Sequence, residues 1–413
     1  MKRKFAFGLL NVAVVASASG QGLYSVGEEA KESLPLKWVV GASAIYDDNV
    51  APGTIDAGGN EVKDSSFALN PYVGVSFVSM TPQTTWDVYA RLGLIYYFDA
   101  PDTMDDLNSQ SRMGVNLTHR FSERLRFASR NFISYELEPD YSYGYASSRS
   151  IGEYFYWSTD NSVGFRWSER VATYTGLGLT GTTYPDVDDN DRFTWQVYNQ
   201  FRYQLSPQTV LTGDYRYSQT SASGIASDSS DQYLLGGIEH RFTPTSIGIV
   251  RAGVQFRDVD QGDNSTSPYL EAALNSQINE KFRVRSFARY GIESYDTVQS
   301  FEDSGKFYTV EYDDRETLRF GLSGDYAISP MFSLFGGLDY IPTSYRSGRV
   351  LTGGYVGSVD QDEDILNAYI GLSVKFNETV TGTMSYTYTN SSSDIYGREY
   401  DRNRISVGVS AEF

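Results

Sequence analysis

Cysteine is absent from this 413-residue chain, histidine occurs only twice, and no apolar run is long. Without cysteine there is no disulfide framework, no CxxC motif and no thiolate zinc site. The two histidines, His119 and His240, fall on the apolar side of their segments beside Phe121 and Phe242. No acid or serine of the same face lies near enough in sequence to suggest a catalytic triad. We therefore expect no enzyme activity, no cofactor and no dedicated metal site.

Long hydrophobic stretches are missing as well. Outside the N-terminus no window supplies the ~20 apolar residues that a membrane-spanning helix needs, and the mean hydropathy is −0.38. Aromatic residues nevertheless make up 15% of the chain, with 33 Tyr and 23 Phe. Strands that alternate between lipid and water hide their apolar half from a window average and place tyrosine at the membrane interfaces. The composition therefore favours a membrane β-barrel over a soluble domain.

The N-terminus has the three parts of a secretory signal peptide. Met1–Lys4 is basic, Phe5–Val15 is an apolar run, and Ala16–Gly20 consists of small residues. The apolar run is too short for a membrane anchor. We expect residues 1–20 to be a signal peptide, residues 21–35 a short periplasmic lead-in, and residues 36–413 one transmembrane β-barrel.

Apolar and polar residues alternate along nearly all of the remaining chain, and short connections take turns with long, acidic ones. A period-2 pattern of this extent is typical of an antiparallel sheet that closes on itself. The sequence predicts an all-β, up-and-down antiparallel barrel of about 18 strands, with about 16 as the alternative. Each short periplasmic turn opens with Ser, Thr or Asn, whose side chains stabilise tight turns. These turns are Thr81–Gln83, Ser122–Arg124, Ser168–Arg170, Ser206–Gln208, Thr243–Thr245, Asn279–Lys281, Ser329–Pro330 and Asn377–Thr379.

The formal charge of −18 arises from 52 acidic and 34 basic residues, and the acids gather in the long extracellular connections. Two dense runs, Asp186–Asp191 and Asp360–Asp364, offer oxygen ligands but lack the residue order of an EF-hand. We expect solvated, self-repelling loops and not a dedicated calcium site; loose divalent-cation binding that bridges the loops to anionic lipopolysaccharide stays open. No nucleic-acid partner is expected.

Both ends of the barrel sequence resemble known outer-membrane proteins. Arg404–Phe413 alternates apolar and polar residues up to a terminal phenylalanine, as in the C-terminal signature of outer-membrane β-barrels. Ala411 departs from that signature, which usually has a bulkier residue there. Trp38–Tyr46, followed by Asp47–Asn49, resembles the start of the largely uncharacterised β-barrel porin families of Gram-negative bacteria. The resemblance implies an outer-membrane location, with Phe413 recognised by the barrel-assembly machinery.

Inward-facing arginines are the candidate pore-lining residues, because guanidinium groups suit carboxylate, phosphate or sulfate groups on a solute. They are Arg112, Arg126, Arg130, Arg251, Arg257, Arg283, Arg285, Arg289, Arg315 and Arg319. The alternative is that they only brace the wall by pairing with inward acids such as Asp87, Asp214, Glu239, Glu271 and Asp325. A further hypothesis is a stacking track for sugar rings built from Tyr89, Tyr97, Tyr174, Tyr198 and Tyr369.

These features predict a porin-like channel for passive diffusion of small hydrophilic solutes, anions among them. An outer loop, residues 296–314 or 346–364, would fold inward and narrow the lumen. The alternatives are an export channel for an anionic polysaccharide and a non-conducting structural or adhesive barrel. The sequence also leaves a homotrimer open.

Overall fold

The computed structural model describes residues 33–55, 61–102, 104–137, 152–185, 191–260, 262–294, 296–303, 305–352 and 357–413. The predicted signal peptide and nearly all of the lead-in lie outside these ranges, as do residues 186–190 of the first acidic run. Within them, no helix is long and apolar enough to cross a membrane.

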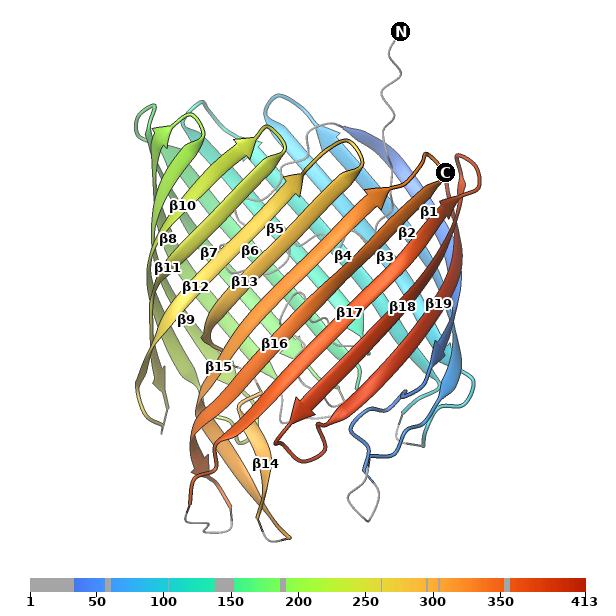
Figure 1. Cartoon of the computed structure of the whole chain (residues 1–413). Coiled ribbons are helices and arrows are strands. Elements are labelled where there is room, and N and C mark those ends of the chain that lie inside the picture. Colours follow the sequence, from blue (N-terminus) through green and yellow to red (C-terminus); the bar gives the residue numbers. More distant parts are fainter. Residues whose placement is uncertain are drawn as a thin grey trace.

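Nineteen strands are described, and their bounds are as follows: β1 Leu34–Asp47, β2 Ser66–Met80, β3 Thr84–Tyr97, β4 Leu107–Arg120, β5 Leu125–Glu136, β6 Tyr154–Arg166, β7 Val171–Thr183, β8 Arg192–Ser206, β9 Thr209–Ala222, β10 Ser229–Thr243, β11 Ser246–Val259, β12 Ser265–Gln277, β13 Phe282–Ile292, β14 Val298–Asp303, β15 Lys306–Ala327, β16 Phe332–Val350, β17 Gln361–Lys375, β18 Val380–Ser393 and β19 Tyr400–Glu412. They follow one another around a closed barrel, and β1 pairs with β19 (Figure 1). β14 pairs only with β15, while β13 also pairs directly with β15, so eighteen of the nineteen described strands form the wall. The predicted antiparallel barrel is confirmed.

All eight predicted short turns lie between consecutive wall strands at one end of the barrel. Their first residues act as expected. The Asn279 carboxamide oxygen accepts a hydrogen bond from the Phe282 backbone N–H at 3.0 Å, and Asn377 does the same for Val380 at 2.7 Å. Thr81 and Ser122 bond the backbone in the same way through their hydroxyls. Local turn chemistry thus fixes one end of every long hairpin.

The barrel closes between its first and last strands. The Trp38 N–H donates to the Phe413 carbonyl at 2.7 Å, and the Phe413 N–H donates back to Trp38 at 2.9 Å. Toward the other end of this seam, the buried Asp47 carboxylate accepts hydrogen bonds from the Arg402 guanidinium, the shortest at 2.5 Å. Phe413 therefore holds the closing pair together at the end with the short turns.

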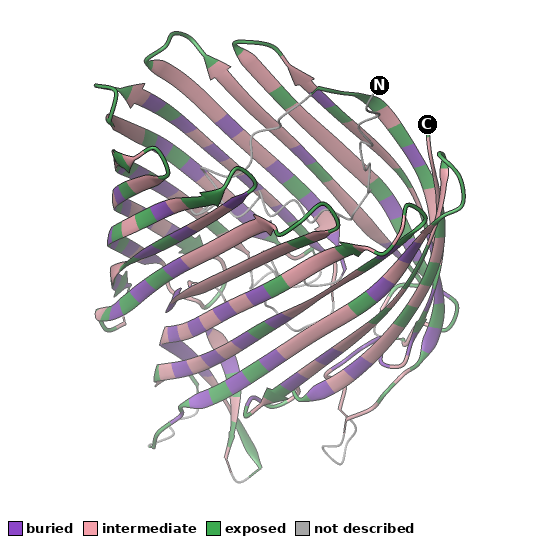
Figure 2. Cartoon of the chain, turned by 45° about the horizontal axis from the view of Figure 1, so that its top comes forward, coloured by how far each residue is buried: buried purple, intermediate pink, exposed green. Residues whose placement is uncertain are grey.

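Exposure alternates along the wall strands, as the sequence predicts for a sheet with an apolar outside and a polar inside (Figure 2). On β8 the outward Phe193, Val197 and Phe201 are exposed, whereas the inward Gln196 and Gln200 are buried. Because no second layer of the described residues covers the apolar face, hydrocarbon is the environment in which this surface is stable.

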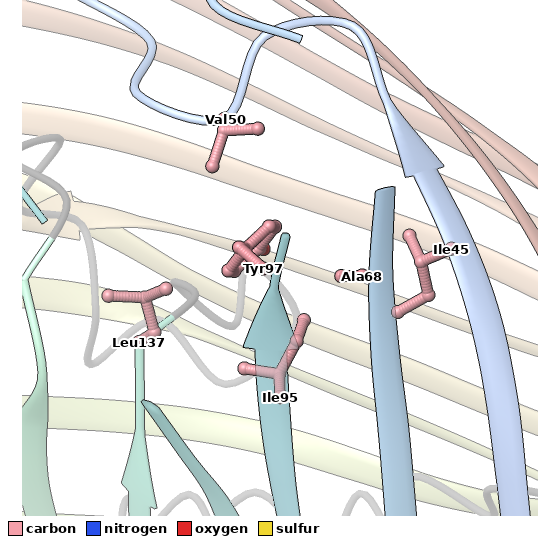
Figure 3. Close-up of a cluster of buried hydrophobic side chains, with 6 residues drawn as sticks. All are labelled: Ile45, Val50, Ala68, Ile95, Tyr97 and Leu137. Atoms are coloured by element: carbon pink, nitrogen blue, oxygen red, sulfur yellow. The ribbon is translucent and has the colours of Figure 1, made fainter. Parts of the chain in front are cut away.

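At the end with the long connections, residues from the connections pack inside the barrel in two apolar clusters. The first joins two connection residues, Val50 and Leu137, to side chains of β1–β3, namely Ile45, Ala68, Ile95 and Tyr97 (Figure 3). The second joins Val359 and Ile395 to Val310, Tyr312 and Tyr345 of β15 and β16. Both clusters fill lumen space at this end.

The structure corrects most of the first predicted constriction loop, whose start at Asp296 does lie inside the barrel mouth, and both ends of the second. Residues 298–303 and 306–311 form a β-hairpin that extends beyond the rim of the barrel instead of folding inward (Figure 1), while Val310 at its base packs in the second cluster. Residues 346–350 belong to β16 and residues 361–364 to β17, so the acidic run Asp360–Asp364 is almost entirely the start of β17. Of this predicted loop, Val359 does pack inside the barrel. The alternating residues of both segments suit strands, and their high charge concealed that pattern.

Candidate functional site

The inner face of β8–β12 carries a buried network of charged side chains centred on Arg251. Its guanidinium lies 3.4 Å from a carboxylate oxygen of Glu239, 3.4 Å from one of Glu271 and 3.7 Å from one of Asp214. Arg251 and Glu271 are both fully buried. The three acids are among those that the sequence offers as bracing partners.

Two further arginines complete this network. Arg202 on β8 holds Glu239 through two hydrogen bonds of 2.7 and 2.6 Å. Arg216 on β9 holds Glu271 at 2.7 and 3.1 Å, and the Tyr269 hydroxyl donates to the same carboxylate at 2.8 Å. Three guanidinium groups therefore meet three carboxylates, and the network is neutral as a whole. Paired forks of this kind are the strong form of the arginine–carboxylate contact.

A second group of contacts surrounds Arg257 on β11. Its guanidinium donates to the Asp231 carboxylate at 3.2 Å, to the Ser294 hydroxyl at 2.7 Å and to the Asp313 backbone carbonyl at 3.2 Å. Ser294 belongs to the connection between β13 and β14, so this arginine ties that connection to the wall.

Glu293, in the same connection, receives three of the candidate arginines. Its carboxylate lies 2.5 Å from Arg289, 2.8 Å from Arg315 and 2.7 Å from Arg319. Burial raises the pKa of Glu293, but the guanidinium groups of Arg319, Arg289 and Arg315 outweigh it and leave the pKa well below its ordinary value. The carboxylate is therefore ionised and clamps the start of this connection against the inner wall.

Asp296 extends the clamp to the connection between β18 and β19. Arg398, between β18 and β19, donates to both of its carboxylate oxygens, at 2.9 and 2.8 Å. Glu363 of β17 lies 3.7 Å from the same guanidinium, and the Tyr345 hydroxyl lies 3.3 Å from Asp296. Burial lowers the pKa of Arg398, but the charge of Asp296 overcomes this and the net pKa is raised. Two connections that are far apart in sequence are thus joined inside the barrel mouth.

The remaining predicted arginines, unlike those above, differ from one another in whether they have an acidic partner. Arg112 forms a forked ion pair with Glu136, one hydrogen bond of which is 2.9 Å long. Arg126 and Arg130 both have contacts on the inner face of β5. Arg283 and Arg285, near the end of the barrel with the short turns, differ because within the described ranges neither has a carboxylate within 4 Å; the acid that interacts with both at longer range is Asp325.

Sequence reasoning missed several members of these networks. Arg202 and Arg216 share the inward parity of the predicted residues, so the alternation alone could have included them. Glu293, Asp296 and Arg398 lie in connections, where no periodicity indicates a direction. For them only the folded positions of the connections reveal the contacts.

The inward tyrosines lie against the wall. A Cβ atom built on Gly176 would lie 2.3 Å from the Tyr198 ring, and one on Gly114 would lie 2.2 Å from the Tyr89 ring. Each ring therefore occupies the space of a side chain that the neighbouring strand lacks. Tyr198 also donates to Asp160 at 3.1 Å. This arrangement braces the sheet and does not favour a stacking track along the lumen.

Neither histidine belongs to a chemical site in this arrangement. His119 bonds the Thr84 hydroxyl at 2.8 Å and packs edge-on to Phe121, and His240 repeats both contacts with Thr209 and Phe242. Among the described residues, no group of three or more His, Cys, Asp or Glu side chains is placed to hold a metal ion.

No protein-family model and no curated protein matches the chain. Solved structures with a related outline include the outer membrane protein OpdK of Pseudomonas aeruginosa, at 11% identity and a TM-score of 0.45, covering 92% of this chain and 99% of that one. OccK2 (OpdF) of the same species, in complex with glucuronate, is 11% identical with a TM-score of 0.46, covering 92% of this chain and 98% of that one. The outer membrane channel DcaP of Acinetobacter baumannii is 12% identical with a TM-score of 0.43, covering 94% of this chain and 99% of that one.

Proposed function

We propose that the chain is a porin-like channel of the Gram-negative outer membrane that passes small hydrophilic solutes by diffusion. The observation that carries this proposal is the closed eighteen-strand wall, apolar outside and charged inside. Barrels of about this strand number enclose a lumen too wide for wall side chains alone to fill. Its partners would be outer-membrane lipid and lipopolysaccharide outside, the barrel-assembly machinery at Phe413, and passing solutes inside. Residues 1–20 would be the export signal.

The ion pairs restrict where an anion preference could arise. Arg251 and its two companion arginines are balanced by three acids, so the middle of this wall presents polarity without net charge. Arg283 and Arg285 share one acid, Asp325, and so keep a net positive charge; Arg289, Arg315 and Arg319 also outnumber their shared acid Glu293, but they are held on it by ion pairs of 2.5–2.8 Å. We therefore assign anion preference to this pair, at the end with the short turns, and a bracing role to Arg251.

Ion conductance in planar bilayers tests both statements. The wild-type protein should show discrete channel steps, and a salt gradient should give a reversal potential that indicates preference for anions. The double variant Arg283→Ser, Arg285→Ser should reduce that preference. Arg346→Ser is the matched control, because Arg346 is an exposed arginine paired with Asp362 at the other end. Absence of channel steps would contradict the channel, and an unchanged reversal potential in the double variant would contradict the assignment.

One observation favours a second candidate, a non-conducting structural or adhesive barrel. The connection residues Val50, Leu137, Val359 and Ile395 pack inside the end with the long connections. A lumen sealed by these clusters would give a folded barrel without conductance. An exporter of anionic polysaccharide is less favoured, because the arginines and tyrosines that it would use are engaged in the wall.

A further inference from the structure

The outward face of β5–β8 has uncharged polar side chains in mid-strand, at a level where neighbouring outward residues are apolar. We call these residues the polar patch: Ser129, Asn131, Thr159, Asn161, Thr175 and Asn199. Their outward direction follows from strand parity, since Ile133, Val163 and Phe201 lie on the same faces of β5, β6 and β8 and are exposed.

The patch consists of two halves, on β5–β6 and on β7–β8, which meet diagonally because Asn161 lies opposite Leu177 and Thr175 opposite Val163. Asn131 and Thr159 are directly opposite each other, as are Thr175 and Asn199. The Thr159 hydroxyl donates to the Asn131 carboxamide oxygen at 2.8 Å, and the Asn161 amide donates to the Thr159 hydroxyl at 2.8 Å. The Asn199 amide donates to the Thr175 hydroxyl at 2.7 Å. These side chains therefore share one face and form two hydrogen-bonded groups on it.

The patch lies within the apolar belt and not at either rim. On β6, Asn161 has Trp157 toward one end and Phe165 toward the other, and on β8, Asn199 lies between Trp195 and Tyr203. Among the described wall strands, no other outward mid-strand position carries an amide. The opposite wall shows the usual pattern, with Phe320, Leu322, Leu334 and Leu338 at this level.

Hydrocarbon is a poor environment for such a surface, because it offers amides nothing to bond. The internal hydrogen bonds satisfy part of the patch only. Within the described residues, the carboxamide oxygens of Asn161 and Asn199 accept no hydrogen bond, although each could accept two. Polar groups that face outward from a membrane protein are used to bind another protein surface.

We propose that the polar patch is the contact surface for a second copy of this chain, an inference that rests on the proposed membrane-spanning barrel. Each asparagine both donates and accepts, and the patch has no charge, so it can face its own copy without repulsion. The outward faces of β4–β9 span about 24 Å at about 4.8 Å per strand. Over a belt about 25 Å tall this is about 600 Å² in projection, close to the ~800 Å² per partner of a stable interface.

Replacing the amides by leucine tests the contact. The triple variant Asn131→Leu, Asn161→Leu, Asn199→Leu should remain a folded barrel, because leucine suits lipid, but should become monomeric in mild detergent by native mass measurement. Ser286→Leu is the matched control, since Ser286 is an outward polar residue in the middle of β13 on another wall. A wild-type protein that is monomeric, or a triple variant that keeps the wild-type assembly, would overturn the proposal.

Cysteine cross-linking in membranes gives a second measurement that does not depend on detergent. The chain has no cysteine, so a single introduced thiol can pair only with its counterpart in another copy. Asn161→Cys should give a disulfide-linked pair on mild oxidation, whereas Val250→Cys, exposed on β11, should not. Equal cross-linking at both positions, or none at 161, counts against the interface. Bilayer conductance of the same samples separates the two proposals, because a conducting monomer refutes only the interface and a cross-linked silent barrel refutes only the channel.

Discussion

Neutralising Glu271 is the sharpest test of the charged network on the inner wall. The carboxylate is fully buried and holds Arg216 by two hydrogen bonds, with Arg251 at 3.4 Å. Glu271→Gln keeps the shape but leaves Arg216 without a charged partner at the same distance, and removal of one member of a buried ion pair costs about 3–5 kcal/mol. At about 1.4 kcal/mol per factor of ten, that is a loss of roughly 100-fold or more in the folding equilibrium.

Urea unfolding in lipid vesicles, followed by tryptophan fluorescence, measures this loss. Asp362→Asn is the comparison, because Asp362 pairs with Arg346 where both side chains are exposed, and such pairs contribute about 0–1 kcal/mol. Adding Arg216→Gln to Glu271→Gln should restore part of the stability, since the buried charge is then removed. The Glu271 variant should also increase anion preference in bilayers. A loss below about 1 kcal/mol would show that water screens the network, and the reasoning from burial would be refuted.

Three further predictions concern the connections and the seam. Arg398→Gln should free the connection at Asp296, so that amide hydrogen exchange of residues 293–297 becomes faster, while exchange in β8 stays unchanged. Because the pKa of Glu293 is lowered in the folded state, its stabilising contribution is present above the pKa of the unfolded state, roughly 4.3, and is lost as pH falls through the lower folded value. Glu293→Gln should therefore lessen the drop in unfolding temperature between neutral and acidic pH. Phe413→Ser keeps the backbone pairing with Trp38 but removes the terminal aromatic ring, and should slow insertion by purified assembly machinery more than it changes the stability of the inserted barrel.

The fold was predictable because its signals are local. Alternation along a strand and the Ser, Thr or Asn at each short turn act over a few residues, and together they set strand direction and the position of each hairpin. The hairpin of β14 and β15 was missed for a local reason as well. Val310 and Tyr312 alternate there with the polar Thr309, Glu311 and Asp313, but the surrounding acids resemble a solvated loop.

The candidate site was predictable only in part, because its chemistry depends on which strands become neighbours in space. The alternation placed Arg251 and Glu271 on the inner face. Because they lie on consecutive strands, an ion pair between them could be predicted as one of the alternatives. Parity does not reveal that Glu293 leaves β13 and turns back to meet Arg319 from β15. That contact depends on the path of a connection, which the sequence pattern does not encode.

The alternation of apolar and polar residues that predicts this barrel also identifies the polar patch, which is an exception to that alternation. Along each wall strand the outward residue at mid-depth is expected to be apolar, and Leu322 or Val250 satisfies the expectation. Asn161 and Asn199 do not, although a single change at each position would make them apolar and more stable against lipid. Two amides near mid-depth on nearby strands cost free energy when they face hydrocarbon. Such a local conflict in an otherwise consistent fold marks a place where another requirement acts. Contact with a second copy is a requirement that would remove this cost, because it replaces hydrocarbon by hydrogen-bonding groups of the same kind.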